Sequence, residues 1–224
     1  TEEQKKRWLP GIRDGSEGWA QGYSEPDSGS DLASLQFSAV REGDEYVLNG
    51  TKIWTSAAQH ADWIFCLART DNSGKKQEGI SFIIAEMDRP GITVTPIITI
   101  DGKHALNQVH FDNVRVPAEQ LIGGVEGVGF KTAMKVLDKG RLHISAISVG
   151  AAERMLDDAL HYAIDRKQFG QSISNFQGVQ FMLADMAMKV EAARLMVYNA
   201  AARAERGEGN LGFISAASKC LASD

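Results

Sequence analysis

Cysteine is scarce in this sequence, and long apolar runs are absent. The only two cysteines, Cys66 and Cys220, lie far apart and match no spacing typical of a metal or redox site. We therefore expect unpaired thiols in a reducing compartment, and neither a structural disulfide nor a metal centre. No apolar run approaches the ~18 residues of a membrane-spanning helix, and we expect no signal peptide. A net charge of −5 argues against a nucleic-acid binder, which normally has a basic face.

The composition is that of an ordinary globular protein. Apolar residues make up 43% and charged residues 24% of the 224 residues, which is enough for one or two domains with a sizeable core. Residues 1–15 are typical of the end of a charged helix that stops near Pro10. Residues 211–224 continue a helical pattern without a cap. We therefore expect the sequence to be a piece of a longer protein.

Short runs of β-forming residues dominate the first half of the sequence. Turn residues separate these runs, and the Asn49–Gly50 pair predicts a hairpin turn because both residues tolerate positive φ. The predicted strands are residues 35–41, 45–48, 51–55, 63–69, 79–85, 92–97 and 108–116. Short strands at regular intervals predict an antiparallel barrel or sandwich.

The hydrophobic period changes after the glycine-rich segment 123–129. Apolar residues of the segment 130–160 recur at the spacing of a buried helical face, and Gly170 offers a left-handed stop. A second predicted helix, 179–200, is apolar on more than one side, as in a bundle or a subunit interface. We therefore predict an α+β protein. Its domains are the end of an N-terminal helical domain at 1–18, a β-domain at 19–124 and part of an up-down helical bundle at 125–224.

Two segments of the predicted β-domain have the chemistry of a ligand site. In the segment YSEPDSGSD, Pro26 and Gly29 favour a tight loop that presents backbone N–H groups and hydroxyls to an anion or a heterocycle edge. The alternative is a solvent-exposed turn with Asx and Ser caps. In the segment GTKIWTS, the indole of Trp54 could cover a flat cofactor, and the next two hydroxyls could bond its edge. The alternative is a tryptophan in the core or on a strand face.

Two segments of the predicted bundle also stand out. Gly140 lies inside a long helix, where glycine costs roughly 1 kcal/mol relative to alanine. Either another backbone packs closely there or a ligand needs the room. Asp138 and Arg141 share one helical face, and a simple exposed ion pair is the alternative to a ligand contact. In the segment RKQFG, residues 166–170, the two basic residues complement the dipole of the preceding helix. The dipole does not explain the remaining residues of the segment.

In this order and spacing, these segments resemble the acyl-CoA dehydrogenase family over essentially the whole chain. The family phrases read T-E-P-x-x-G-S-D, N-G-x-K-x-W-[IT]-[TS], F-x-x-V-x-V-P, D-x-x-R, R-K-x-F-G and F-Q-x-x-Q-F-x-L-A-[DE]-M-A. They are matched by residues 24–31, 49–56, 111–117, 138–141, 166–170 and 176–187. The first match has Ser24 in place of threonine.

The resemblance implies FAD-dependent α,β-dehydrogenation of an acyl-CoA thioester to a trans-2-enoyl-CoA. It implies that FAD is bound by Tyr23, Ser24, Gly29, Ser30, Trp54, Thr55, Ser56, Arg166, Phe169 and Gln177. The last three would reach the FAD of a neighbouring subunit in a homodimer or homotetramer. The acyl-CoA would contact Ser30, Asp138 and Arg141. The implied electron acceptor is an electron-transfer flavoprotein, and the implied location is a bacterial cytoplasm or the mitochondrial matrix.

The sequence offers no catalytic base. In most of the family the base is a glutamate in a loop that would lie beyond Asp224. In some branches it precedes the D-x-x-R arginine, where this sequence has Gly140. Residues 102–109 lack the family's common arginine-glycine phrase, which leaves the acyl-chain preference open. Two other functions stay open: a different enzyme on the same flavin scaffold, such as an oxidase, and a non-enzymatic piece that only oligomerises and partly binds cofactor.

Overall fold

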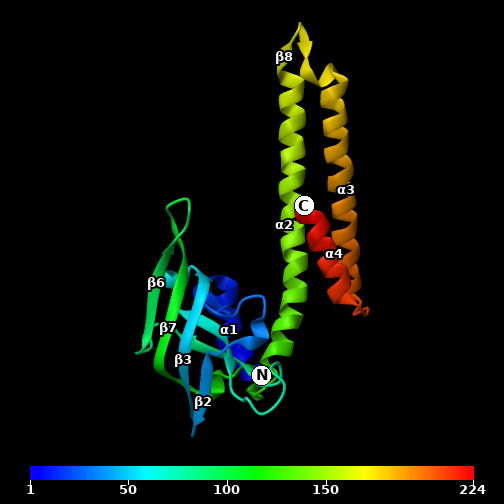
Figure 1. Ribbon diagram of the computed structural model, residues 1–224. Helices are drawn as coiled ribbons and strands as arrows, with labels where there is room; N and C mark the ends of the chain where they lie inside the picture. Colours follow the sequence, from blue (N-terminus) through cyan, green and yellow to red (C-terminus); the bar gives the residue numbers. More distant parts are fainter. The chain divides into compact units, whose positions relative to one another are not determined.

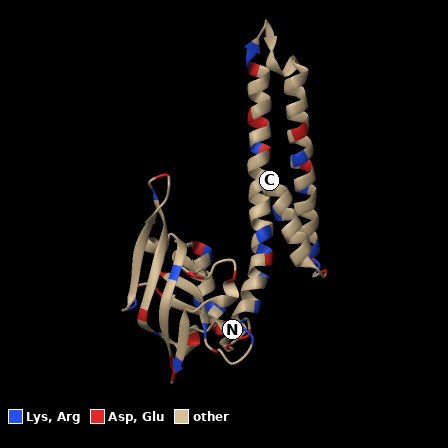
Figure 2. Cartoon of the chain, viewed as in Figure 1, with Lys and Arg blue, Asp and Glu red and all other residues tan.

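The computed structural model describes residues 1–224 and shows a mixed α+β protein, which confirms the predicted fold class. The chain divides into two units, Thr1–Ala133 and Met134–Asp224, and the domain boundaries predicted after residues 18 and 124 stay predictions. No helix has both the length and the apolar sequence that crossing a bilayer requires. Acidic and basic residues are scattered over both the sheet and the helices (Figure 2).

The first unit is built on a curled sheet (Figure 1). Neighbouring strands follow the order β1-β4-β2-β3-β7-β6, and β5 pairs with β4. The pairings are antiparallel, apart from those that β4 makes with β1 and β2. The strands are β1 (Trp19–Gly22), β2 (Ser38–Glu42), β3 (Glu45–Ser56), β4 (Trp63–Arg69), β5 (Ile80–Glu86), β6 (Ile92–Ile98) and β7 (His104–Pro117). Apolar side chains from the central strands fill the core of this sheet.

The hairpin turn predicted at Asn49–Gly50 is wrong. Strand β3 continues through both residues, and its pairing with β7 shifts register between Leu48 and Gly50. Gly50 has φ +131°, and a Cβ atom there would lie 3.1 Å from Phe37 Cα. Glycine is therefore needed for a bulge inside one strand, not for a turn between two. The turn lies at residues 43–44, between β2 and β3.

Helix α1 (Glu2–Asp14) precedes the sheet. It continues through Pro10 to a left-handed cap at Gly15, so the stop predicted near Pro10 is wrong. Its Trp8 packs edge-on against Trp63 of β4, with ring centroids 5.8 Å apart. This aromatic contact fixes the helix on the sheet.

The side chain of Gln4 in α1 joins the beginning of the first unit to its end. Its Nε2 donates to the carbonyls of Glu119 and Leu121, both at 2.8 Å. Its Oε1 accepts from the backbone N–H of Gly123 at 3.0 Å. One amide group thus satisfies three backbone groups that follow β7.

The second unit contains helices α2 (Gly129–Asp165, of which the first turn belongs to the first unit), α3 (Gln177–Glu205) and α4 (Leu211–Ser223). Helices α2 and α3 lie side by side and are joined by a short hairpin of β8 (Lys167–Gln168) and β9 (Gln171–Ser172) (Figure 1). The stop predicted at Gly170 is therefore wrong, because α2 ends at Asp165. Gly170, with φ +78°, forms the hairpin tip together with Phe169, with φ +52°.

Candidate functional site

A cavity of about 360 Å³ lies in the first unit, between β1 and the end of β3. Its lining residues are Trp19, Gln21, Tyr23, Ser24, Ile53, Trp54, Ser56 and Phe65. Four of them, Tyr23, Ser24, Trp54 and Ser56, are residues that the sequence resemblance assigns to FAD. The fold thus brings together two segments that are about thirty residues apart in the sequence.

A direct backbone contact joins the two segments. The N–H of Ile53 donates to the carbonyl of Ser24 at 2.9 Å. Beyond Ser24, the loop closes on itself, since Glu25 and Ser28 exchange two backbone hydrogen bonds of 2.7 and 3.1 Å. Gly29 and Ser30, which are also predicted to bind FAD, are exposed beyond this turn and do not line the cavity.

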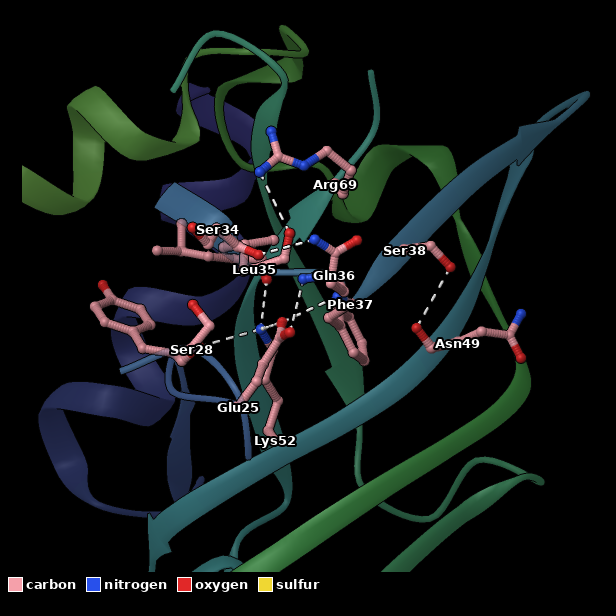
Figure 3. A network of polar contacts seen from close by, with 12 residues as sticks. Glu25, Ser28, Ser34, Leu35, Gln36, Phe37, Ser38, Asn49, Lys52 and Arg69 are labelled. Atoms are coloured by element: carbon pink, nitrogen blue, oxygen red, sulfur yellow. Dashed lines mark hydrogen bonds and ion pairs between the residues drawn. The ribbon is translucent and has the colours of Figure 1, made fainter. Parts of the chain in front are cut away.

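A buried ion pair fastens the loop to β3 from beneath (Figure 3). Lys52 is 0% exposed, and its Nζ lies 2.9 Å from Glu25 Oε1. The same ammonium donates to the carbonyls of Tyr23 at 3.2 Å and Leu67 at 2.8 Å. Burial lowers the pKa of Lys52, and the nearby carboxylate of Glu25 opposes that shift.

The carboxylate of Glu25 has further partners. It accepts the backbone N–H groups of Gln36 at 2.7 Å and Phe37 at 2.9 Å. Each charge of the pair is therefore hydrogen-bonded beyond its partner, as a buried ion pair requires. These contacts fix the backbone next to Tyr23 and Ser24, the two loop residues that line the cavity.

Trp54 adopts a backbone conformation that bulky residues avoid. The pairing of β3 with β7 shifts register between Lys52 and Thr55, and Trp54 has φ +62°. A left-handed conformation costs an L-residue roughly 1–2 kcal/mol. The side chain is 58% exposed, so Trp54 is not a core residue, which removes one alternative to a ligand contact. Strain of this kind is common where a fold presents a side chain to a ligand.

The two residues after Trp54 point in opposite directions. Ser56 is exposed and lines the cavity. Thr55 is 1% exposed, and its buried hydroxyl has no hydrogen-bond partner. The prediction that Thr55 binds FAD therefore concerns a residue whose side chain does not line the cavity, although its neighbours on both sides do.

Tyr23 is held among aromatic rings at the wall of the cavity. Its ring lies edge-on to Phe65 and Phe82, with centroid distances of 5.9 and 6.1 Å. Burial raises the pKa of Tyr23 to about 12. The phenol therefore stays neutral at physiological pH and can donate a hydrogen bond.

The remaining candidates lie in the second unit. Arg166, Phe169 and Gln177 gather around the β8–β9 hairpin, and all three are exposed. Phe169 is the most prominent, with 93% of its surface accessible. Its only aromatic neighbour is Phe176, edge-on at 6.1 Å. An apolar side chain presented in this way at a hairpin tip suits contact with another molecule.

Asp138 and Arg141 form an ion pair on α2, with Arg141 Nη1 2.5 Å from Asp138 Oδ1. Both side chains are partly exposed, so the geometry is that of the i,i+3 pair considered as the alternative to a ligand contact. Apart from its chain neighbours and the backbone of its own helix, no atom lies within 4 Å of a Cβ built on Gly140. Close packing of another backbone within the second unit therefore does not explain Gly140.

Comparison with known proteins assigns both units. A family model described as acyl-CoA dehydrogenase, middle domain, matches residues 20–114, and one described as acyl-CoA dehydrogenase, C-terminal domain, matches residues 127–224. The chain belongs to the acyl-CoA dehydrogenase family. The resemblance inferred from the sequence phrases is thereby confirmed.

Individual family members cover the whole chain. FadE25 of Mycobacterium tuberculosis, named as a probable acyl-CoA dehydrogenase, is 50% identical over 229 residues, which cover 100% of this chain and 58% of that protein. The butyryl-CoA dehydrogenase of Megasphaera elsdenii matches with a TM-score of 0.90 and 38% identity, over 100% of this chain and 58% of the other. A chain from a structure described as electron transferring flavoprotein of Acidaminococcus fermentans matches with a TM-score of 0.92 and 43% identity, over 100% and 59%. The chain thus spans less than two thirds of the length of these relatives.

Sequence reasoning missed the role of two residues in the acyl-CoA dehydrogenase phrases. Glu25 and Lys52 stand in the matched phrases, but nothing in the sequence pairs them, because they lie 27 residues apart. A signal was present: a lysine in a strand otherwise rich in β-formers is costly to bury without a partner. Glu25, one of the acidic residues of the loop YSEPDSGSD, was available as that partner.

Proposed function

We propose that the protein is an FAD-dependent acyl-CoA dehydrogenase that oxidises the Cα–Cβ bond of an acyl-CoA thioester to a trans-2-enoyl-CoA. One observation carries this proposal: Trp54 and Ser56 on the bulged end of β3 share a cavity with Tyr23 and Ser24 of the loop. Membership in the acyl-CoA dehydrogenase family supports it.

The cavity fits the ring system of a flavin. An exposed indole offers a flat apolar face, and the hydroxyls of Ser24 and Ser56 offer hydrogen bonds to a polar edge. The volume of about 360 Å³ lies in the usual range for a small-molecule site. The left-handed backbone conformation of Trp54 is of a kind that clusters at functional sites, which supports a ligand-binding role for the indole.

Bound FAD would supply the hydride acceptor. The chain's own residues would hold the ring and exclude water from it: Trp54 over one face, Tyr23 at the wall, and Ser24 and Ser56 at the polar edge. Removal of a thioester α-proton requires a positioned base. Because Gly140 occupies the helix position of the base in some family branches, we propose that the base lies beyond Asp224.

The second unit would complete the site of a neighbouring subunit. We propose that Arg166, Phe169 and Gln177 bind the pyrophosphate and adenine of its FAD. The exposure of Phe169 at the tip of the β8–β9 hairpin supports this assignment. Large apolar side chains also remain exposed along the helices, which supports a homodimer or homotetramer. They include Ile147, Met155, Phe181, Met182, Met188, Leu195 and Tyr198.

The substrate and the electron acceptor follow the same reasoning. We propose that Ser30, Asp138 and Arg141 contact the CoA arm of the acyl-CoA, with the room beside Gly140 open to it. An electron-transfer flavoprotein is the proposed acceptor, supported by a solved relative whose description names such a protein. FadE25 and the butyryl-CoA dehydrogenase are bacterial, which supports a bacterial cytoplasmic location over the mitochondrial matrix.

A Trp54→Ala substitution in the full-length protein tests the placement of FAD. We expect the purified protein to be yellow, and the variant to retain less FAD or to show a shifted visible spectrum. Trp63→Phe is the matched control, because Trp63 is 7% exposed and does not line the cavity. A full-length protein that is colourless and does not bind added FAD would refute the proposed function.

A further inference from the structure

The end of β3 holds two residues in the left-handed region, and neither is glycine. Trp54 has φ +62° and Ala57 has φ +53°. Two such residues within the segment 53–57 persist only where contacts with the surrounding structure outweigh the energetic cost of the left-handed conformation. The contacts that hold the segment 53–57 therefore decide where Trp54 and Ser56 lie.

In addition to the ladder pairing with β7 at Thr55–Asn107 and Ser56–Leu106, three hydrogen bonds hold this segment. On one side, the N–H of Ile53 donates to the carbonyl of Ser24 at 2.9 Å. On the other side, the N–H of Ala57 donates to the carbonyl of Ala105 at 3.0 Å. Between them, the carbonyl of Thr55 accepts from a side chain, Nδ2 of Asn107, at 3.1 Å. This third anchor lies directly between the two cavity residues Trp54 and Ser56.

Asn107 belongs to a closed network whose hydrogen-bond directions are determined. Its Nδ2 also donates to Gln59 Oε1 at 2.6 Å, and Gln59 Nε2 donates to the carbonyl of His104 at 3.2 Å. Carbonyls only accept, so both amide groups have one possible orientation. Asn107 Oδ1 then accepts from His104 Nε2 at 2.6 Å.

We propose that Asn107 is a positioning residue for the bound flavin. It acts through the carbonyl of Thr55, and so it holds the indole of Trp54 and the hydroxyl of Ser56 in the cavity. Asn107 is 0% exposed and does not line the cavity, so its effect is indirect. This inference rests on the proposed function, because it assumes that the cavity binds FAD.

The test uses two variants of the full-length protein. Asn107→Asp keeps the shape and the acceptor for His104 but places an acceptor against the carbonyl of Thr55. Asn107→Leu removes all hydrogen bonds at similar volume. Gln120→Leu is the matched control, because Gln120 is also buried and donates to Glu86 at 2.9 Å, and neither residue lines the cavity. All three variants lose a side-chain hydrogen bond of a buried amide, but only the first two remove the side-chain bond to the carbonyl of Thr55.

Three measurements separate positioning from simple loss of stability. In protein freed of FAD, amide hydrogen exchange of the segment 53–57 should accelerate in both Asn107 variants and not in the control. The dissociation constant for FAD should rise about three- to tenfold, as expected for one lost hydrogen bond. The visible flavin spectrum should shift in the Asn107 variants alone.

The outcomes also separate this inference from the proposed function. Unchanged FAD affinity and spectrum in both Asn107 variants would overturn the positioning role, even where thermal stability falls as much as in the control. A general loss of stability with equal effects in all three variants would overturn it too. Failure of the unsubstituted protein to bind FAD would instead refute the proposed function.

Discussion

Removing the positive charge of Lys52 should destabilise the protein far more than removing any exposed charge. Lys52→Met keeps most of the side-chain volume but leaves the carboxylate of Glu25 buried without a counter-charge. Glu25→Gln creates the reverse situation, a buried ammonium with only the carbonyls of Tyr23 and Leu67 as partners. Both variants should still express, because the apolar core around the pair is unchanged.

The magnitude follows from the burial of the pair. The Lys52 side chain is 0% and the Glu25 side chain 7% exposed, and breaking such a pair costs about 3–5 kcal/mol. In the double variant no buried charge remains, and the loss should be that of imperfect neutral hydrogen bonds, about 1–2 kcal/mol. The two single losses would sum to at least about 6 kcal/mol against at most about 2 kcal/mol for the double variant, so the double-mutant cycle should depart from additivity by about 4 kcal/mol or more, above the usual range of about 0.5–3 kcal/mol.

Urea unfolding followed by tryptophan fluorescence measures this cycle. The signal reports on the first unit, because the four tryptophans of the chain, Trp8, Trp19, Trp54 and Trp63, all lie there. Arg154→Ala is the matched control, because its ion pair with Asp158 is exposed, and we expect no measurable change in the midpoint. If the two single losses sum to the double loss within about 0.5 kcal/mol, the pair is not coupled and the reasoning is wrong.

Further outcomes are expected at Gly140, at Gly50 and at the two cysteines. Gly140→Ala should raise the free energy of unfolding by up to about 1 kcal/mol, since no atom outside the surrounding helix backbone lies within 4 Å of the new Cβ. Gly140→Glu should restore some dehydrogenase activity to a full-length protein whose own base has been removed. Gly50→Ala should lower thermal stability markedly, because φ is +131° and Phe37 Cα lies 3.1 Å from the added atom; a melting temperature equal to that of the unsubstituted protein would contradict the bulge. Thiol titration should detect Cys220 at once and Cys66 only after unfolding. Because burial raises the pKa of Cys66 from 9.0 to about 12, the folded state retains that proton longer, and the stability advantage over Cys66→Ala should shrink as the pH rises above 9.

Much of the fold was accessible from local patterns. Short runs of β-forming residues predicted most strands of the sheet, and the helical period predicted α2 and α3. The errors share a physical cause. Asn49–Gly50 has the composition of a turn, but the neighbouring ring of Phe37 requires a glycine for close approach within a continuous strand. A pattern of residue types cannot distinguish these two uses of glycine.

The site was predicted through its matched phrases, which identify residues but not their contacts. Trp54 and Ser24 were named from the sequence, and the structure places them in one cavity. The strain at Trp54 and the anchor from Asn107 were not predictable, because both arise from pairing between β3 and β7 and from a register shift. Such features depend on tertiary contacts, which no local sequence signal encodes.

The contact of Gln4 with the backbone after β7 has an evolutionary and practical consequence. Gln4 holds the segment that enters the sheet against the segment that leaves it. The sheet can therefore be inserted between different flanking helices as one unit. Flanking helices can then vary in length or angle without pulling the sheet apart. Transfer of the sheet to a protein with other flanking helices should require that Gln4 and its three hydrogen bonds are kept.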